Sequence, residues 1–250
     1  MAGPKTLARP DGEVIAYHAR AGKSPGVLFC GGFKSDMTGA KAMALDEACA
    51  NAGRPFVRFD YLGHGASSGE FRAGTIGRWR DDTLAVLDEL TTGPQIVVGS
   101  SMGGWLALLA AMARPERVSG LVLVAPAPDF TEALVWASMT AAQREALLRD
   151  GVLLEPSEYS AEPYAITLKL IEEGRHHLIL DAGIPFNGPV RILHGMKDAD
   201  VPWRHSLRLI EALKTADVTM TLYKTGDHRL SGPAQLADLC AAVEALAAGL

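Results

Sequence analysis

The sequence lacks the features that mark several large classes of protein. Aromatic residues make up only 6% of the chain, no basic stretch is interleaved with them, and the net charge is −5. The three cysteines form no CxxC pair and no metal-ligand spacing, and each lies in an apolar segment, where a thiol packs as a small hydrophobic group: Cys30, Cys49 and Cys240. We therefore expect no metal site and no nucleic-acid partner.

Long apolar runs are also missing. The longest uncharged one, Met102–Ala113, is too short to span a bilayer and is interrupted by two glycines. Residues 1–14 hold neither the apolar core of a secretory signal nor a small-residue cleavage site. These absences predict a cytoplasmic protein with no stable membrane insertion.

What the sequence does contain is an alternation of strands and helices. Hydrophobic residues make up 48% of the 250 positions, enough for a sizeable core. Short apolar or β-branched runs bounded by glycine or proline predict the strands Glu13–Tyr17, Gly26–Cys30, Phe56–Phe59, Gln95–Val98, Gly120–Val124, Val190–His194 and Val218–Tyr223. Helical periodicity predicts the helices Ala40–Ala52, Ile76–Leu90, Met102–Ala113, His205–Lys214 and Ala234–Ala248. Because several strands are apolar almost throughout, we predict an α/β fold with a mostly parallel, doubly wound sheet.

One stretch, residues 129–185, interrupts this alternation with helical signals and no convincing core strand. We predict that residues 1–128 and 186–250 form the α/β core and that 129–185 is a helical lid inserted in it. Such a lid covers the carboxyl edge of the strands, where open α/β sheets bind their ligands. Its apolar side chains either line a substrate pocket or pack as an ordinary helix core: Phe130, Leu134, Val135, Trp136 and Met139.

Capping signals place two helices in this insertion. Thr140 with Gln143 matches a capping box, and we expect the helix that it opens to stop at Gly151. Pro163 suits the first turn of a second helix, which is expected to end at Gly174.

The clearest chemical motif is GxSxG, formed by Gly99, Ser101 and Gly103 between a predicted strand and a predicted helix. A serine raised on a sharp strand-to-helix turn needs small residues two positions away on each side, because strand and helix cross closely there. The helix N-terminus also favours negative charge that develops at the serine. GxSxG alone also occurs by chance as a tight turn, but this context favours a nucleophile at Ser101.

A serine hydroxyl attacks well only when an imidazole takes its proton and a carboxylate orients that imidazole. The chain order that accompanies this motif is serine, acid, histidine. His228, which follows the last predicted strand, is therefore the expected base. Asp198 and Asp200 both follow the strand Val190–His194; we favour Asp198, because it holds the acid position of HGxxDxxVP, and Asp200 is the alternative.

Acyl transfer also needs backbone N–H groups that stabilise an oxyanion. Met102, directly after the serine, is the first expected donor, and Phe33, in the Gly-Gly-Phe segment after a predicted strand, is the second. The expected substrate-binding residues are Gly32, Trp136 and Trp203. A further glycine-rich segment, Asp60–Gly69, lacks the GK[ST] ending of a phosphate loop, and we interpret it as structural, with Asp60 bonded to nearby backbone.

These motifs resemble a known family. They are similar to the abhydrolase-domain branch of the α/β hydrolases, which contains the mitochondrial palmitoyl-protein thioesterase that also acts as an acyl-glucuronide esterase. The matching stretches are spread over nearly all the chain: 23–42, 58–69, 93–105, 113–118, 193–203 and 227–229. The resemblance implies the α/β-hydrolase fold, a triad of Ser101, Asp198 and His228, and Phe33 and Met102 as oxyanion donors.

We predict a serine hydrolase that cleaves carboxylic esters or thioesters through an acyl-enzyme, with a small molecule or an acylated protein as substrate. This chemistry needs no cofactor, and we expect a monomer or a homodimer. Four cationic or titratable residues are candidate contacts for an acidic leaving group such as glucuronate: Arg175, His176, His177 and Arg204. A carbon–carbon bond hydrolase, an acyltransferase and a non-catalytic ligand receptor are the alternatives on the same scaffold.

Overall fold

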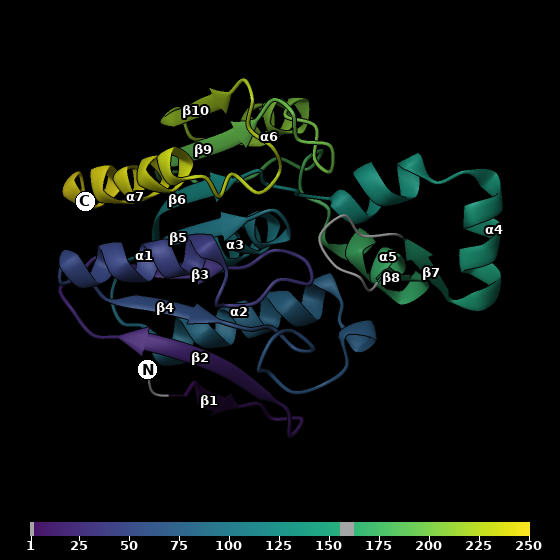
Figure 1. Cartoon of the computed structure of the whole chain (residues 1–250), viewed down its shortest axis with the longest axis horizontal. Coiled ribbons are helices and arrows are strands. Elements are labelled where there is room, and N and C mark those ends of the chain that lie inside the picture. Colours follow the sequence, from purple (N-terminus) through teal and green to yellow (C-terminus); the bar gives the residue numbers. More distant parts are fainter. Residues whose placement is uncertain (1–2, 156–162) are drawn as a thin grey trace.

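An eight-stranded sheet forms the centre of the molecule in a computed structural model that describes residues 3–155 and 163–250 (Figure 1). Its strands are β1 Lys5–Ala8, β2 Val14–Arg20, β3 Gly26–Cys30, β4 Phe56–Phe59, β5 Gln95–Ser100, β6 Val118–Val124, β9 Val190–Gly195 and β10 Val218–Tyr223. They lie in the order β1-β2-β4-β3-β5-β6-β9-β10. β2 pairs antiparallel with both neighbours, whereas every pairing from β4 to β10 is parallel.

Helices cover both faces of this sheet (Figure 1). One layer holds α1, Ala40–Asn51, and α7, Pro233–Ala248; the other holds α2, Ile76–Leu90, α3, Met102–Ala113, and α6, Arg204–Ala212. The alternation of side chains along β3 explains the two cores, because odd and even positions of a strand face opposite ways. Val27 packs in the α1–α7 cluster and Leu28 in the α2–α3 cluster. This arrangement confirms the predicted doubly wound α/β sheet.

The predicted strands and helices of the core are present, and where they differ from the structure the difference is in their first or last residues. Three strands and two helices have the predicted bounds: β3, β4, β10, α2 and α3. The sequence does not predict β1, because this edge strand reads KTLA and three of its four residues are exposed. An edge strand with so little buried surface carries no apolar alternation to detect.

Between β6 and β9 the chain leaves the sheet and builds the insertion (Figure 1). Its elements are a π-helical turn Thr131–Trp136, α4 Ala141–Asp150, β7 Val152–Glu155, β8 Tyr164–Thr167, α5 Leu168–Gly174 and a 3₁₀ turn Arg175–His177. The capping box of Thr140 and Gln143 is present, and α4 ends at Gly151 with a positive φ of 73°, as predicted.

Two expectations for the insertion are wrong. It is not purely helical, because β7 and β8 pair antiparallel as a small separate sheet. Pro163 does not open a helix: it precedes β8, and α5 begins only at Leu168, where the Thr167 side chain accepts the Leu170 N–H. Short apolar runs such as VLLE of β7 and YAIT of β8 are ambiguous between strand and helix in sequence, and their pairing with one another decides the conformation.

A buried carboxylate joins the two ends of the insertion. Asp129, at its start, accepts the backbone N–H groups of Ile179 (2.9 Å) and Leu180 (3.0 Å) at its end. A second link joins α5 to α2, since the Glu173 carboxylate accepts the Gly77 N–H. The Asp129 bonds therefore join the two ends of the insertion to one another, and the Glu173 bond fixes the insertion to the core.

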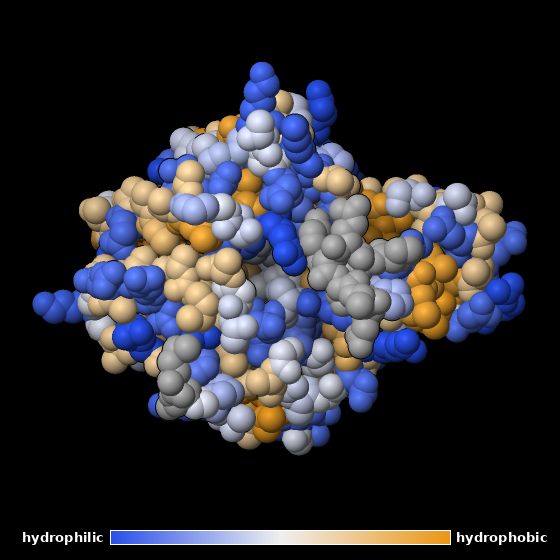
Figure 2. Space-filling view, in the orientation of Figure 1, coloured by the Kyte–Doolittle hydropathy of each residue, from blue (hydrophilic) through white to orange (hydrophobic). Residues whose placement is uncertain are grey.

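The outer part of the insertion keeps apolar surface exposed. Leu148 of α4 and Leu154 of β7 expose 58% and 52% of their surface. Figure 2 shows apolar side chains gathered over this end of the molecule, apart from the mostly hydrophilic surface around it.

We expect Asp129→Asn to lower the free energy of unfolding by about 2 kcal/mol, because the amide nitrogen of asparagine cannot accept one of the two buried N–H groups. Urea unfolding measures the change, and limited proteolysis should cut the variant faster within the insertion. The control is Asp150→Asn, which breaks an exposed pair with Arg149 and should leave the unfolding midpoint unchanged. Equal midpoints for all three proteins would contradict the role of Asp129.

Candidate active site

Ser101 lies on a tight turn between β5 and α3, with a backbone φ of 55° that side chains rarely adopt. Three backbone hydrogen bonds hold the turn. The Ser101 N–H donates to Val124 (2.9 Å), and its carbonyl accepts from Gly104 (2.8 Å) and Ala127 (3.1 Å). The strained conformation therefore persists because neighbouring strand and helix backbone fix it from both sides.

The glycines of the motif have a steric reason. A Cβ on Gly103 would lie 2.1 Å from the Cys30 carbonyl oxygen, and a Cβ on Gly99 would lie 2.4 Å from the Gly103 oxygen. Strand and helix thus cross too closely for any side chain at these two positions. This is the geometry that the GxSxG spacing predicts.

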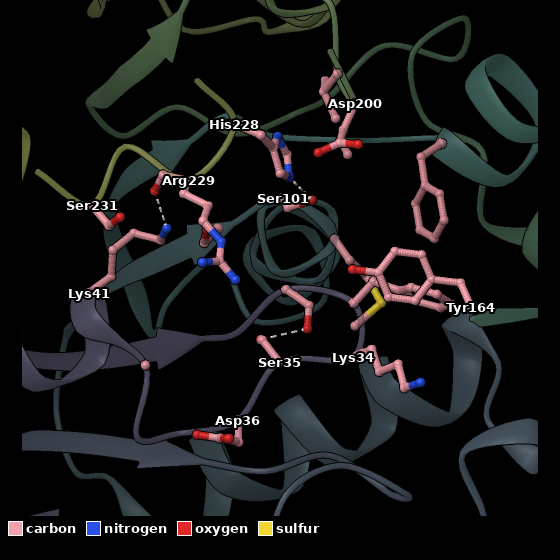
Figure 3. Close-up of a pocket in the computed structure, with 18 of the residues that line it drawn as sticks. Lys34, Ser35, Asp36, Lys41, Ser101, Tyr164, Asp200, His228, Arg229 and Ser231 are labelled. Atoms are coloured by element: carbon pink, nitrogen blue, oxygen red, sulfur yellow. Dashed lines mark hydrogen bonds between the residues drawn. The ribbon is translucent and has the colours of Figure 1, made fainter. Parts of the chain in front are cut away.

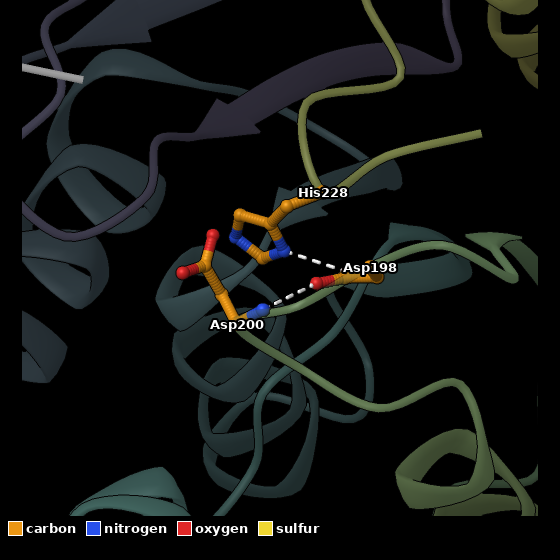
Figure 4. A group of neighbouring side chains, drawn as sticks. All are labelled: Asp198, Asp200 and His228. Atoms are coloured by element: carbon orange, nitrogen blue, oxygen red, sulfur yellow. Dashed lines mark hydrogen bonds and ion pairs between the residues drawn. The ribbon is translucent and has the colours of Figure 1, made fainter. Parts of the chain in front are cut away.

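The structure brings three distant side chains together at the carboxyl edge of the sheet. Ser101 Oγ lies 3.0 Å from Nε2 of His228, which follows β10 (Figure 3). His228 Nδ1 lies 2.7 Å from Oδ2 of Asp198, which follows β9 (Figure 4). A carboxylate only accepts, so Nδ1 carries the proton and Nε2 is left to accept from the Ser101 hydroxyl. Such an arrangement can move a proton from the hydroxyl to the imidazole.

Asp198, rather than Asp200, bonds the imidazole. Its Oδ1 accepts the N–H groups of Asp200 (3.0 Å) and Val201 (2.8 Å), while Oδ2 faces His228. Burial by itself raises the pKa of Asp198, but hydrogen bonds from His194 and His228 outweigh burial and lower that pKa to about 2. The side chain therefore stays an anion at neutral pH. Asp200 instead lines the adjoining pocket.

His194 is a site residue to which the sequence assigns no role. Its ring is fully buried, with Nε2 near Asp198 Oδ2 (3.2 Å) and the Val201 carbonyl (2.9 Å). Both of these partners are acceptors, so Nε2 carries the proton, and Nδ1 faces the Ser206 hydroxyl at 2.7 Å. His194 thus donates to the same Asp198 oxygen, Oδ2, that His228 contacts. The available signal is its place four residues before Asp198 in the HGxxDxxVP motif.

Three side chains of this site are also close enough to hold a cation. Ligand atoms of Asp198, Asp200 and His228 lie within 4.8 Å of one another (Figure 4). The oxygens of Asp198, however, already accept from protein N–H groups on every side. The bonding of this carboxylate is therefore that of an imidazole orienter and not of a metal ligand.

The expected oxyanion donors flank Ser101. Met102 is the first residue of α3, where N–H groups have no partner within the helix. The Gly32 backbone passes so close that a Cβ there would lie 3.4 Å from the Ser101 Cβ, and Phe33 follows directly. Neither the Met102 nor the Phe33 N–H donates to an acceptor among the residues that the structure describes. Both groups are thus available to an oxygen bound at Ser101.

A cavity of about 650 Å³ opens in front of Ser101. Apolar side chains line one side of it: Phe33, Ala127, Phe130, Leu134, Val135, Tyr164 and Ile166. Polar and charged side chains also line it: Ser35, Asp36, Thr38, Lys41, Asp200, Arg229 and Ser231, with Lys34 beside the Tyr164 ring. In Figure 3, Tyr164 lies on one side of Ser101, and Lys41 and Arg229 lie on the opposite side. The cavity therefore has two chemically different arms that meet at the serine.

Several predicted contacts lie outside this lining. Trp136 is flanked by the guanidinium groups of Arg144 and Arg175, each 5.1 Å from its ring, and Trp203 stacks under Arg204 at 4.5 Å. Of the expected substrate-binding residues, only Gly32 borders the cavity. None of the four residues expected at an acidic leaving group borders it, and His177 instead pairs with Glu173 at 2.7 Å. Lys41, at the start of α1, and Arg229, directly after His228, do line the cavity, and the motifs assign neither of them a role.

The fold and this geometry agree with the comparison to known families. The sequence profile described as the alpha/beta hydrolase family matches residues 27–246. The chain belongs to the α/β-hydrolase family.

Relatives of this α/β hydrolase narrow the chemistry. The human mitochondrial palmitoyl-protein thioesterase ABHD10 is 42% identical to it over 231 residues, which cover 92% of this chain and 75% of the relative. A crystal structure from Agrobacterium vitis S4 matches with a TM-score of 0.93 and 43% identity, over 98% of this chain and 97% of that one. Mouse alpha/beta hydrolase domain-containing protein 10 matches with a TM-score of 0.91 and 40% identity, over 98% of each chain. The resemblance inferred from the motifs is confirmed, and the chain is an ester or thioester hydrolase.

One prediction about location is wrong. The expected cytoplasmic location conflicts with the orangutan, human and bovine relatives, which are named as mitochondrial. The composition of residues 1–14, on which the expectation rested, does not distinguish the cytoplasm from an organelle. In residues 3–155 and 163–250, none of the helices combines the length and the apolar character that crossing a bilayer requires.

The lowered pKa of Asp198 predicts how stability depends on pH. The folded protein keeps this carboxylate ionised down to about pH 2, whereas its usual pKa is 3.8, so its contribution is complete above about pH 4 and is lost as the pH falls toward 2. From pH 5 to pH 3, we expect the wild type to lose about 1 kcal/mol more unfolding free energy than Asp198→Asn. Urea unfolding at the two pH values measures the difference, and equal losses would contradict the lowered pKa.

Proposed function

We propose that this α/β hydrolase works through a catalytic triad in which Ser101 attacks the acyl carbon, His228 accepts the proton and Asp198 orients the imidazole. One observation carries the proposal: a continuous hydrogen-bonded series from Ser101 Oγ through both ring nitrogens of His228 to Asp198, with separations of 3.0 and 2.7 Å. Ser101, the first member of this series, lies where the two cavity arms meet, and an acyl carbon would lie there.

The reaction follows from these positions. Ser101 Oγ bonds to the carbonyl carbon of the ester or thioester while its proton passes to His228 Nε2. The resulting oxyanion accepts hydrogen bonds from the Met102 and Phe33 N–H groups, and the α3 N-terminus adds favourable electrostatics. When the intermediate collapses, the alcohol or thiol leaves with the proton from His228. Water then attacks the acyl-enzyme by the same route and releases the carboxylic acid.

We infer that the apolar arm holds the acyl chain and that residues 129–185 act as its lid. The insertion contributes Phe130, Leu134 and Val135 from one end and Tyr164 and Ile166 from another to the cavity lining. We place the boundary between an α/β core of residues 1–128 and 186–250 and this lid on that basis: the core carries the triad, and the insertion supplies apolar lining. Burying an aliphatic chain against such side chains stabilises the complex by about 0.8 kcal/mol per methylene.

The charged arm suits a leaving group that is polar or anionic. Lys41 and Arg229 line it, and the Lys41 ammonium donates to the Arg229 carbonyl (Figure 3). Burial, together with the nearby Arg229 charge, lowers the pKa of Lys41 to about 8. With the thioesterase name of its relatives, this supports two substrate classes: a fatty acyl thioester of a protein cysteine, and an acyl ester of a carboxylate-bearing sugar such as glucuronate.

We expect Ser101→Ala to lower kcat for p-nitrophenyl butyrate by at least about 10⁴-fold and to abolish labelling by a fluorophosphonate probe, because both reactions need the Ser101 oxygen. Ser138→Ala is the control, since the exposed Ser138 hydroxyl donates to the Val135 carbonyl within the insertion, and its removal should leave both readouts unchanged. Labelling and turnover that survive in Ser101→Ala would contradict the proposed triad.

The same assay separates the alternative functions. An acyltransferase would pass the acyl group to an added alcohol faster than to water, and a carbon–carbon bond hydrolase would cleave a β-diketone. A ligand receptor would bind the probe compounds without turnover. Hydrolysis of esters and thioesters to free acid, in preference to these reactions, is the outcome that we expect.

We expect Arg229→Gln to raise KM for an acyl glucuronide about 5- to 20-fold and to change KM for neutral p-nitrophenyl butyrate by less than twofold. The reason is that a hydrogen bond to a carboxylate is lost only with the anionic substrate. Arg149→Gln, an exposed arginine of the insertion, is the matched control. A similar rise of KM for both substrates would argue against a leaving-group contact at Arg229.

A further inference from the structure

The loop Asp60–Ala66, between β4 and α2, lies against the loop that follows β3 and contains Phe33. Three hydrogen bonds join the two loops: Asp60 Oδ1 accepts the Met37 N–H (2.7 Å), the Tyr61 hydroxyl donates to the Gly31 carbonyl (3.2 Å), and His64 Nε2 accepts the Lys34 N–H (3.1 Å). The bonds from Tyr61 and His64 lie on either side of Phe33. The loop Asp60–Ala66 therefore also holds the loop that contains Phe33 in place.

The proton of His64 can be placed from its partners. The Lys34 backbone N–H can only donate, so Nε2 is the acceptor and the ring proton is on Nδ1. That proton points to the Leu62 carbonyl at 3.1 Å, which also accepts from the Trp79 indole at 3.1 Å. Leu62 in turn donates its N–H to the buried Asp82 carboxylate on α2 (2.9 Å). His64 is thus anchored to α2 by groups that are themselves fixed.

The surroundings of His64 keep it neutral and immobile. Only 3% of the residue is exposed, and its ring makes edge contacts with Tyr61, Phe71 and Trp79 at centroid distances of 5.5, 5.1 and 5.2 Å. Burial lowers the pKa of His64 to about 4, so the Nε2 lone pair is available at neutral pH. Phe33 packs on the same Phe71 and Trp79 rings.

The peptide that His64 holds determines where the Phe33 backbone lies. The Lys34 N–H belongs to the same rigid peptide plane as the Phe33 carbonyl. Lys34 itself has a positive φ of 55°, a conformation that is unfavourable for a residue with a side chain. A rotation of this peptide would relieve Lys34. Because it changes ψ of Phe33, it would also disturb the adjoining Gly32–Phe33 peptide, which carries the Phe33 N–H. The bond to His64 opposes that rotation.

We propose that His64 is a positioning residue of the oxyanion hole, which holds the Lys34 N–H so that the Phe33 N–H stays directed at the oxyanion. The inference rests on the proposed function, because it assigns His64 a role in that hole. His64 touches neither substrate nor Ser101; it acts through the Phe33–Lys34 peptide. Its effect is therefore expected on the transition state more than on substrate binding.

Two substitutions of His64 test the idea. The side-chain amide of His64→Asn can reach the position of Nδ1 and bond the Leu62 carbonyl, but it is too short to accept from Lys34. In His64→Gln the amide oxygen can reach the position of Nε2 and accept that N–H. Both lose the same aromatic ring, so the thermal melting temperature should fall similarly in the two variants.

With p-nitrophenyl butyrate, we expect His64→Asn to lower kcat about 10- to 100-fold with KM changed less than threefold, and His64→Gln to stay within about fivefold of the wild-type kcat. An alkyl trifluoromethyl ketone, whose adduct with Ser101 carries an oxyanion, should bind His64→Asn more weakly by the same factor as kcat falls. If the two variants lose kcat equally, or if KM rises instead of kcat falling, the role of His64 is merely structural and the inference is wrong.

Two further variants keep the test decisive. If neither His64 variant folds, Tyr61→Phe removes the hydroxyl that donates to the Gly31 carbonyl, and it should lower kcat and ketone affinity together about 3- to 10-fold; unchanged values would overturn the inference. Ser101→Ala separates the two proposals. An inactive Ser101→Ala beside a fully active His64→Asn refutes the role of His64 alone, whereas an active Ser101→Ala refutes the triad and this inference together.

Discussion

The close crossing of β5 and α3 is the constraint on which the rest of the site depends. Gly99 and Gly103 let strand and helix approach so tightly that Ser101 is held with a positive φ, projecting its hydroxyl above the sheet edge. Strain of this kind persists only where the surroundings over-determine it. Here the hydrogen bonds to Val124 and Ala127 of the next strand and its loop do so. The helix start and both cavity arms take their positions from this turn.

The parallel sheet by itself brings Asp198 and His228 close to Ser101. Carboxyl ends of neighbouring parallel strands meet at one edge, so the loops after β9 and β10 deliver Asp198 and His228 to the loop after β5. Each group is then fixed by a further buried residue: His194 holds the Asp198 carboxylate, and α2 supports the loop that contacts the Phe33 segment. The reacting groups are thus surrounded by a rigid polar network in a largely apolar core.

The sequence predicts the core sheet and the Ser101, Asp198 and His228 set because those signals are local: a strand, a spaced motif and a helix start. It fails where a contact depends on tertiary pairing. The β7–β8 hairpin forms only because the two short strands find each other, and Trp136 faces two arginines that no spacing reveals. Lys41 and Arg229 likewise have no predicted role, because only the fold brings the start of α1 and the loop after β10 to one cavity.

The two hydrogen bonds that Asp129 accepts bear on how the substrate range of such enzymes changes in evolution. Asp129, where the chain leaves the core, accepts N–H groups of Ile179 and Leu180, where the chain returns to it. These bonds close the insertion at its base. Residues can be added, removed or exchanged beyond that point without displacing β6 or β9. Substrate range can therefore change through substitutions in the insertion, while Ser101, Asp198 and His228, which all come from the core, keep their positions.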